Sequence, residues 1–124
     1  MKIGIFDSGI GGLTVFRQLM KKLPNNDYVY LGDTARLPYG IKSRKTVVEY
    51  SIKNTQFLIN KGCDLIVIAC NTASAFAYDI LRKKFNVPIF NVIDSGVFAV
   101  KDSGIQDIRV IATPSTIDSK TYTN

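Results

Sequence analysis

The 124-residue sequence predicts an α/β fold in which an open parallel sheet is flanked by helices. Three observations support this prediction. Short aliphatic segments alternate with longer segments whose apolar residues recur every three or four positions, as in amphipathic helices. The segment 65–69 is almost wholly aliphatic, which is typical of a parallel strand buried on both faces. The resulting β-α-β-α order indicates consecutive parallel strands joined by covering helices.

Apolar periodicity and the residues that begin or end helices define the expected elements. Strands are expected at 2–6, 28–32, 65–69, 88–92 and 108–112, and helices at 13–23, 44–61, 71–85 and 96–101. Pro24 ends the first helix. Ser43 can cap the second at its start, and Gly62 ends it. The segment 119–124 has the composition of the first turn of another helix.

We expect two units in the chain, with a boundary near residue 95. Residues 1–95 form the first α/β domain, and residues 96–124 are the start of a second α/β domain. A last strand that leads into a single helical turn is an unusual place for a domain to end. We therefore expect the chain to be truncated.

Composition and charge argue against several classes of protein. The net charge is +6, but two of the basic clusters close predicted helices, where cations suit the helix dipole, so the charge does not call for a nucleic-acid partner. Membrane spans need roughly 20 consecutive apolar residues, and we expect none here. Two cysteines without a dense pattern indicate reduced thiols in the cytoplasm. The absence of histidine excludes Ser-His-Asp and Cys-His catalysis within this chain.

Polar residues follow three of the predicted strands. Asp7 and Ser8 follow the first strand, Asp33 follows the second, and Cys70 follows the third. Ligands bind at the carboxyl ends of the strands in open α/β sheets. The loop 38–40 comes from the same edge, so we expect these residues to converge on one crevice.

Cys70 is the most informative of these residues. A helix N-terminus beside it would lower the thiol pKa and favour a thiolate, which can act as a base, a nucleophile or a metal ligand. The structural alternative is a small buried cysteine of the core. Neighbouring Asn71 and Thr72 can hydrogen-bond a polar ligand, which favours a functional role. Cys63 lies at the opposite end of the same strand, too far from Cys70 to pair with it.

The glycine-rich turn after the first strand has two interpretations. Gly9, Gly11 and Gly12 leave free amides at the start of a helix, which suits a carboxylate or a phosphate. A tight turn without a ligand explains the same residues. Asp7 would either be a carboxylate satisfied by these amides, an acid/base partner, or a partner for a substrate ammonium.

Four segments carry a resemblance to a known family. They are FDSGIGGLT at 6–14, DTARLPYG at 33–40 and ACNTAS at 69–74, and the segment 111–116 is a fourth. In order and spacing they resemble the motifs of the aspartate/glutamate racemase family, and the 33–40 segment favours glutamate racemases over the related aspartate racemases. The resemblance covers the whole chain and implies the parallel α/β fold of that family.

The resemblance implies a cofactor-independent isomerase that interconverts L- and D-glutamate and supplies D-glutamate for peptidoglycan, with neither pyridoxal phosphate nor a metal. Cys70 would be one of two acid/base thiols at Cα, the one that deprotonates D-glutamate, and Asp7 would assist it. The residues that would hold the substrate are Asp7, Ser8, Tyr39, Gly40, Asn71 and Thr72. Thr113 and Thr116 are further candidates for contact with a carboxylate.

The second thiol of such enzymes lies in a half that this chain lacks, so we expect the chain alone to be inactive. Glutamate is the implied partner, and a homodimer is the assembly to test. The physical logic agrees with the implied chemistry. Inversion at a carbon needs a base on each face, and hydrogen-bond donors must stabilise the charge that builds up on the carboxylate.

Other interpretations stay open at this point. A nucleotide-binding α/β module would use Gly9 and Gly11 for the phosphates and Asp33 for the ribose. Thr14 occupies the position of the third fingerprint glycine, however, and this interpretation leaves Cys70 unexplained. An aspartate racemase is a second alternative. A non-catalytic fragment that only dimerises or regulates is a third.

Overall fold

The computed structural model describes residues 1–123. Within that range the chain forms a parallel sheet of four strands in the order β2-β1-β3-β4. The strands are β1 (Lys2–Asp7), β2 (Asp27–Gly32), β3 (Leu65–Ile68) and β4 (Ile89–Asn91). The register places Asp7 opposite Gly32 and Phe6 opposite Ile68, so the carboxyl ends of three strands meet at one edge. The predicted fold class is confirmed.

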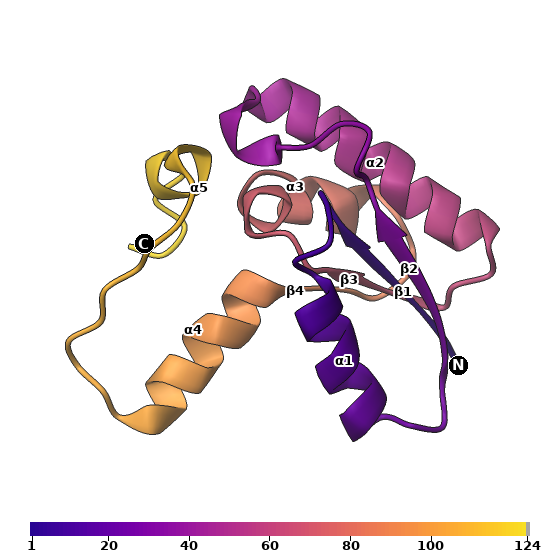
Figure 1. Ribbon diagram of the computed structural model, residues 1–124, viewed down its shortest axis with the longest axis horizontal. Helices are drawn as coiled ribbons and strands as arrows, with labels where there is room; N and C mark the ends of the chain where they lie inside the picture. The colour runs from indigo at the N-terminus through magenta and orange to yellow at the C-terminus, as the bar shows by residue number, and fades with distance from the viewer. Residues whose placement is uncertain (124) are drawn as a thin grey trace.

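Helices cover both faces of this sheet (Figure 1). The helical elements are α1 (Leu13–Lys22), the 3-10 helix η1 (Tyr39–Ile41), α2 (Arg44–Asn60), α3 (Asn71–Lys84), α4 (Val92–Ser103) and α5 (Pro114–Asp118). Helix α1 lies on one side of the sheet, and α2 and α3 lie on the other.

The core follows the alternation of side chains along β1. Ile3 and Ile5 face α1, and they pack in a cluster that includes Val67. Phe6 faces the other way and packs with Ile68 beneath α2 and α3. Successive side chains of a strand point to opposite faces, which explains why the buried strands read as continuous aliphatic runs.

Two local signals set where α4 begins and ends. The Asn91 side chain accepts a hydrogen bond from the Asp94 N–H at 2.9 Å and donates one to the Asp94 carboxylate at 2.8 Å. This cap begins the helix directly after β4, earlier than the predicted start at residue 96. Gly104, with φ of 70°, ends it. The predicted domain boundary near residue 95 falls inside α4, and the division into 1–95 and 96–124 stays a prediction.

Two predicted elements near the C-terminus are wrong. Residues 108–112 form no regular element and pair with none of the described strands, and Ile111 is 99% exposed. No helix begins at residue 119 in the described range; the helix there is α5, which starts at Pro114 after the cap position Thr113 and ends at Asp118. Residues 119–123 follow it as turns, and Asn124 lies outside the described residues.

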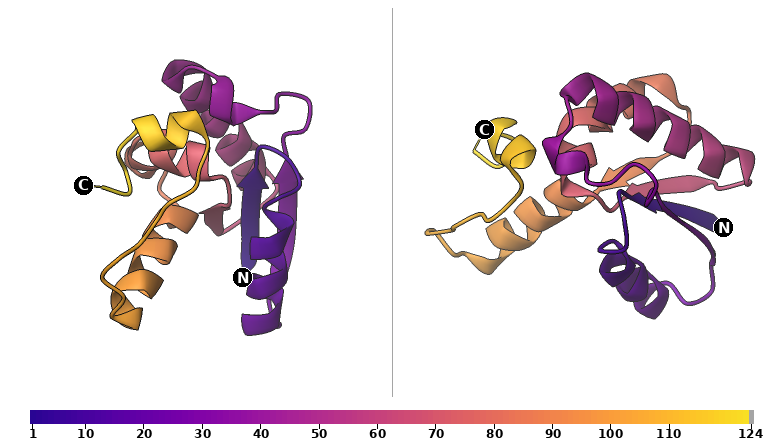
Figure 2. Two further views of the ribbon diagram at one scale, coloured as in Figure 1. Left: turned by 60° about the vertical axis from the view of Figure 1, so that its left-hand side comes forward. Right: turned by 45° about the horizontal axis from the view of Figure 1, so that its top comes forward.

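The C-terminal segment returns to the body of the molecule. Figure 2 shows α5 beside η1 and the start of α3. The Ser115 hydroxyl donates to the carbonyl of Gly40 at 2.6 Å. Residues far apart in the sequence therefore share the carboxyl edge of the sheet. Across residues 1–123, none of the helices combines the length and the apolar character that crossing a bilayer requires.

Candidate functional site

A cavity of about 600 Å³ opens at the carboxyl edge of the sheet. Its walls include the whole set that the family resemblance implies for catalysis and substrate binding: Asp7, Ser8, Tyr39, Gly40, Cys70, Asn71 and Thr72. The further candidate Thr116 is not among the described residues that line it. The predicted convergence of these residues is therefore observed, while their individual roles stay predictions. A separate cavity of about 670 Å³ lies between α1 and the start of α4, and mostly apolar side chains such as Leu19, Leu65 and Phe90 line it.

Cys70 occupies the cap position at the start of α3. Its Sγ accepts a hydrogen bond from the Ala73 N–H at 3.4 Å and lies 3.7 Å from the Ser8 hydroxyl. Only 6% of the residue is exposed. The thiol is therefore placed at the cavity by the helix start, and it is shielded from most of the solvent.

The predicted low pKa of Cys70 is wrong. Burial raises the pKa of the thiol above its ordinary value, and the negative charge of Asp7 raises it further, while hydrogen bonds from Ala73 and Ser8 act in the opposite direction. Loss of water around the sulfur outweighs the favourable amide of the helix start. The neutral thiol is therefore the favoured form at neutral pH.

Asp7 binds the glycine-rich turn that leads into α1. Its Oδ2 accepts hydrogen bonds from the N–H groups of Gly9 at 3.2 Å and Gly12 at 3.0 Å. The Tyr30 hydroxyl donates to the carbonyl of Gly9 at 3.0 Å. Burial, followed by the charge of Asp7, raises the pKa of Tyr30 to about 12, so the phenol stays a donor. The turn is thus held by one carboxylate and one phenol.

Thr72 joins the start of α3 to the C-terminal segment. Its hydroxyl lies 3.1 Å from that of Thr113 and 3.3 Å from that of Thr116, and the last two are 3.1 Å apart. Thr113 also lines the cavity. The family resemblance of segment 111–116 was the signal for these two threonines, although the expected substrate-binding set did not include them.

Asn71 and Gly40 are also held by residues from the C-terminal part of the chain. The Asn71 side-chain oxygen accepts a hydrogen bond from the Tyr122 hydroxyl at 2.8 Å. A Cβ atom at Gly40 would lie 2.7 Å from the Cβ of Thr113, so only glycine leaves room for this approach. The cavity is therefore built from both predicted units of the chain.

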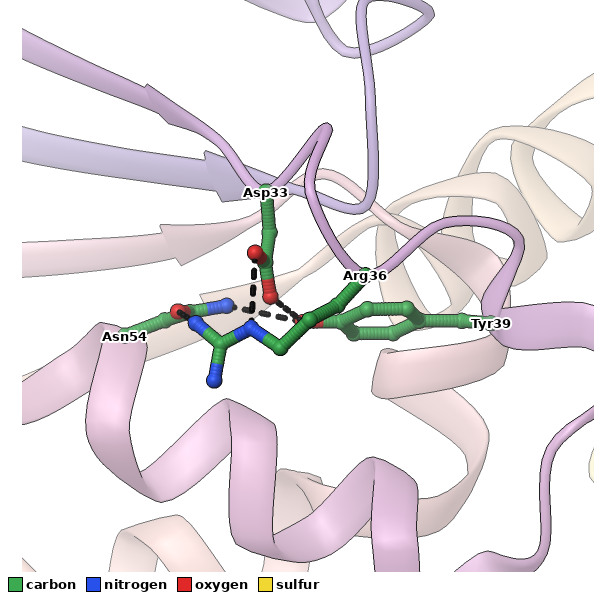
Figure 3. Close-up of polar contacts among 4 residues, drawn as sticks. All are labelled: Asp33, Arg36, Tyr39 and Asn54. Carbon is green, nitrogen blue, oxygen red and sulfur yellow. Dashed lines mark hydrogen bonds and ion pairs between the residues drawn. The ribbon is translucent and has the colours of Figure 1, made fainter.

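The Tyr39 hydroxyl group points toward Asp33 and Asn54 (Figure 3). The hydroxyl donates to Asp33 Oδ2 at 2.5 Å and accepts from Asn54 Nδ2 at 3.0 Å. Burial, followed by the hydrogen bond to Asp33, holds the pKa of Tyr39 far above its ordinary value. The Tyr39 hydroxyl therefore already donates its proton to Asp33, and we expect a ligand to contact the backbone of Tyr39 and not its side chain.

The same contacts weaken the nucleotide-binding alternative. The Asp33 carboxylate is only 6% exposed, and its second oxygen accepts a hydrogen bond from Arg36 Nε at 2.9 Å. Both carboxylate oxygens are thus bound within the protein, and a ribose would need one of them. Among residues 1–123, no three His, Cys, Asp or Glu side chains gather closely enough to hold a metal ion.

Comparisons with known proteins agree with this arrangement. Residues 11–124 match the family described as Asp/Glu/Hydantoin racemase. The glutamate racemase of Aquifex pyrophilus is 54% identical over 98% of this chain and 48% of its own length. The solved structure of glutamate racemase from that organism has a TM-score of 0.94 and 50% identity, and the alignment covers 99% of this chain and 49% of the other.

A second solved structure carries a ligand. The glutamate racemase of Francisella tularensis subsp. tularensis SCHU S4 in complex with D-glutamate has a TM-score of 0.90 and 47% identity, over 98% of this chain and 46% of the other. The present chain thus spans about half the length of the relatives it matches.

Proposed function

This chain belongs to the Asp/Glu/Hydantoin racemase family, and on that premise we propose that it forms one half of a cofactor-independent glutamate racemase site. The observation that carries the proposal is the Cys70 thiol, which lies at the start of α3 within the cavity at the carboxyl edge of the sheet. The names of the similar proteins favour glutamate over aspartate as the substrate.

In the proposed reaction, the Cys70 thiolate removes the α-proton of D-glutamate. The proton passes from Cα to Sγ, and the electron pair of the broken bond is delocalised into the adjacent carboxylate. A raised thiol pKa makes the thiolate a stronger base once it has formed, which brings it closer to the weak acidity of Cα–H. An acid on the opposite face, supplied by polypeptide outside this chain, then completes the inversion.

We assign the surrounding polar groups to the ammonium group and the carboxylates of the substrate. Asp7 uses Oδ2 for the amides of Gly9 and Gly12, and we assign its Oδ1 to the substrate ammonium. The Asn71 amide and the Thr72 hydroxyl, together with the Tyr39–Gly40 backbone, are assigned to the carboxylates. Fixed donors at this position stabilise the charge that develops during proton removal.

We further propose that the parent protein supplies D-glutamate for peptidoglycan in the cytoplasm, where the two free cysteines of this chain stay reduced. A homodimer stays a prediction, and sedimentation of this chain would test it. A strain without the parent gene that grows normally, with no other source of D-glutamate, would contradict the cellular role.

The experiment follows the α-proton of D- or L-glutamate in D₂O by NMR. The chain is assayed alone and together with the C-terminal half of the Aquifex pyrophilus glutamate racemase, which restores the length of the relatives. We expect exchange in the complemented sample and in its Cys63→Ser control, and loss of exchange from D-glutamate in Cys70→Ser. Exchange from D-glutamate that persists in Cys70→Ser, or no exchange in any sample, would contradict the proposal.

A further inference from the structure

The loop between β2 and α2 has two ends with different environments. Its later part, through Tyr39 and Gly40, lines the cavity. Its first residue, Asp33, is not among the described residues that line the cavity, and it is buried beneath the loop. The loop therefore connects a buried carboxylate to the binding surface through the Tyr39 side chain.

Four side chains close a ring of hydrogen bonds under this loop (Figure 3). Tyr39 donates to Asp33 and accepts from Asn54. Arg36 donates to Asp33 at 2.9 Å and to the Asn54 side-chain oxygen at 3.3 Å. Asp33 follows β2 and Asn54 belongs to α2, so the ring ties the loop to two rigid elements.

The direction of each bond in the ring is fixed by chemistry. A phenol has one proton, and the carboxylate of Asp33 can only accept it, while the Asn54 Nδ2 can only donate. An asparagine side chain at position 33 would have a single acceptor oxygen. It could accept a hydrogen bond from Tyr39 or from Arg36 in the present geometry, but its NH₂ group could not accept the other. The charge and the shape of Asp33 are therefore both needed for a satisfied ring.

We propose that Asp33 and Asn54 are positioning residues of the site: they hold the Tyr39 hydroxyl, and through it they fix the Tyr39–Gly40 backbone as a binding surface for glutamate. The inference rests on the proposed function for its substrate. Asp33 acts through Tyr39 and exchanges no proton with the substrate. The Ser115 hydroxyl donates to the Gly40 carbonyl, so side chains hold both residues of the proposed binding surface.

The first test uses this chain alone and measures amide hydrogen exchange by NMR. The Lys42 N–H donates to the Tyr39 carbonyl at 3.0 Å and reports on the loop, while the Ile66 N–H donates to the Pro88 carbonyl at 2.9 Å and reports on the sheet. We expect Tyr39→Phe and Asp33→Asn to speed exchange at Lys42 by about tenfold relative to Ile66, because the ring loses its central bonds.

The matched control is Tyr50→Phe, whose ring lies 5.8 Å from that of Tyr39 and whose hydroxyl takes no part in the ring of Figure 3. It should leave the ratio of the two exchange rates unchanged. Unchanged exchange at Lys42 in both variants, or equal acceleration at Lys42 and Ile66, would overturn the inference. This measurement needs no racemase activity, so its failure is distinct from failure of the proposed function.

The second test uses the chain complemented with the C-terminal half of the Aquifex pyrophilus enzyme. A misplaced binding surface weakens ground-state and transition-state binding together, so we expect Asp33→Asn to raise KM for glutamate about tenfold with kcat within about threefold. The pH profile of kcat should keep its shape. A fall in kcat of about a hundredfold or more, with a lost limb of the profile, would make Asp33 an acid/base group and overturn the inference.

Discussion

Two neighbouring loops at the edge of the sheet each have an aspartate at their start, and the two carboxylates bind different kinds of partner. Asp7 ends β1 and Asp33 follows β2, and the Asp33 N–H donates to the Asp7 carbonyl at 2.9 Å. Asp7 binds backbone amides of a glycine-rich turn, whereas Asp33 binds side chains of Arg36 and Tyr39. The role of each carboxylate is thus decided by the residues that follow it along the chain.

The loops also meet directly. A Cβ atom at Gly32 would overlap the carbonyl oxygen of Gly9, and the Tyr30 hydroxyl binds that same oxygen. The glycine turn therefore rests on the end of β2. Substitutions that remove these contacts one at a time should differ in the stability they cost, and the size of each loss shows how strongly that contact holds the two loops.

The largest effect is expected from Gly32→Ala. The added methyl group would push the backbone of the glycine turn away from β2, and overpacking of this kind costs about 3 kcal/mol of unfolding free energy. Urea denaturation would measure it. The control is Gly96→Ala in α4, where a Cβ meets no atom within 4 Å and the helix should gain up to about 1 kcal/mol. Equal midpoints for the two variants would contradict the close approach.

Asp33→Ala should come next. It leaves the buried Tyr39 hydroxyl without its acceptor and removes the partner of Arg36, so we expect a loss of about 2 kcal/mol. The guanidinium is partly exposed and can turn to water, which limits the loss. Urea denaturation measures it, and a stability equal to that of the wild type would show that the ring of Figure 3 does not stabilise the fold.

Asp7→Ala should cost less, about 1 kcal/mol, because it removes a side-chain acceptor from amides at a helix start. Asp7→Asn keeps an oxygen acceptor and should recover most of that loss. Both follow from the same denaturation experiment. An Asp7→Ala variant that is less stable than Asp33→Ala would reverse the contrast between the two loops.

The smallest effect concerns the Cys70 thiol. Its raised pKa leaves less thiolate at a given pH, so the pH midpoint for alkylation by iodoacetamide should lie above that of a free cysteine. In a Cys63→Ser background, Asp7→Asn should move the midpoint down, because it removes a negative charge that disfavours the thiolate. Asp33→Asn is the matched control and should leave it in place. A midpoint below that of free cysteine would contradict the burial effect.

Residues 1–91 were predictable because their signals are local or follow from the parallel sheet. Aliphatic runs placed the four strands, and Pro24, Ser43 and Gly62 placed the helix ends. Beyond that range, aliphatic composition at 108–112 predicted a strand, but a strand needs a neighbour, and no local pattern supplies one. The early start of α4 was readable from the Asn91–Asp94 cap, and that of α5 from Pro114.

Some features of the site were also predictable from the sequence, and others were not. The sheet topology predicted that Asp7, Cys70 and the Tyr39 loop would converge, and they do. The commitment of the Tyr39 hydroxyl to Asp33 depends on how the loop folds over α2, which no spacing reveals. The pKa of Cys70 was predicted in the wrong direction. It depends on the balance between burial and the hydrogen bonds at the helix start, and that balance is set by the folded positions of Asp7, Ser8 and Ala73 around the sulfur.

Gly40 and Thr113 lie in contact in the wall of the cavity, with no space for a side chain at position 40. These two positions cannot change independently during evolution. A lineage that gained a larger residue at 40 would first need a smaller or displaced residue at 113. A smaller residue at 113 would in turn leave room for residues other than glycine at 40. In an alignment of the family, the two positions should therefore covary, and substitutions at one should be tolerated only in the background of the other.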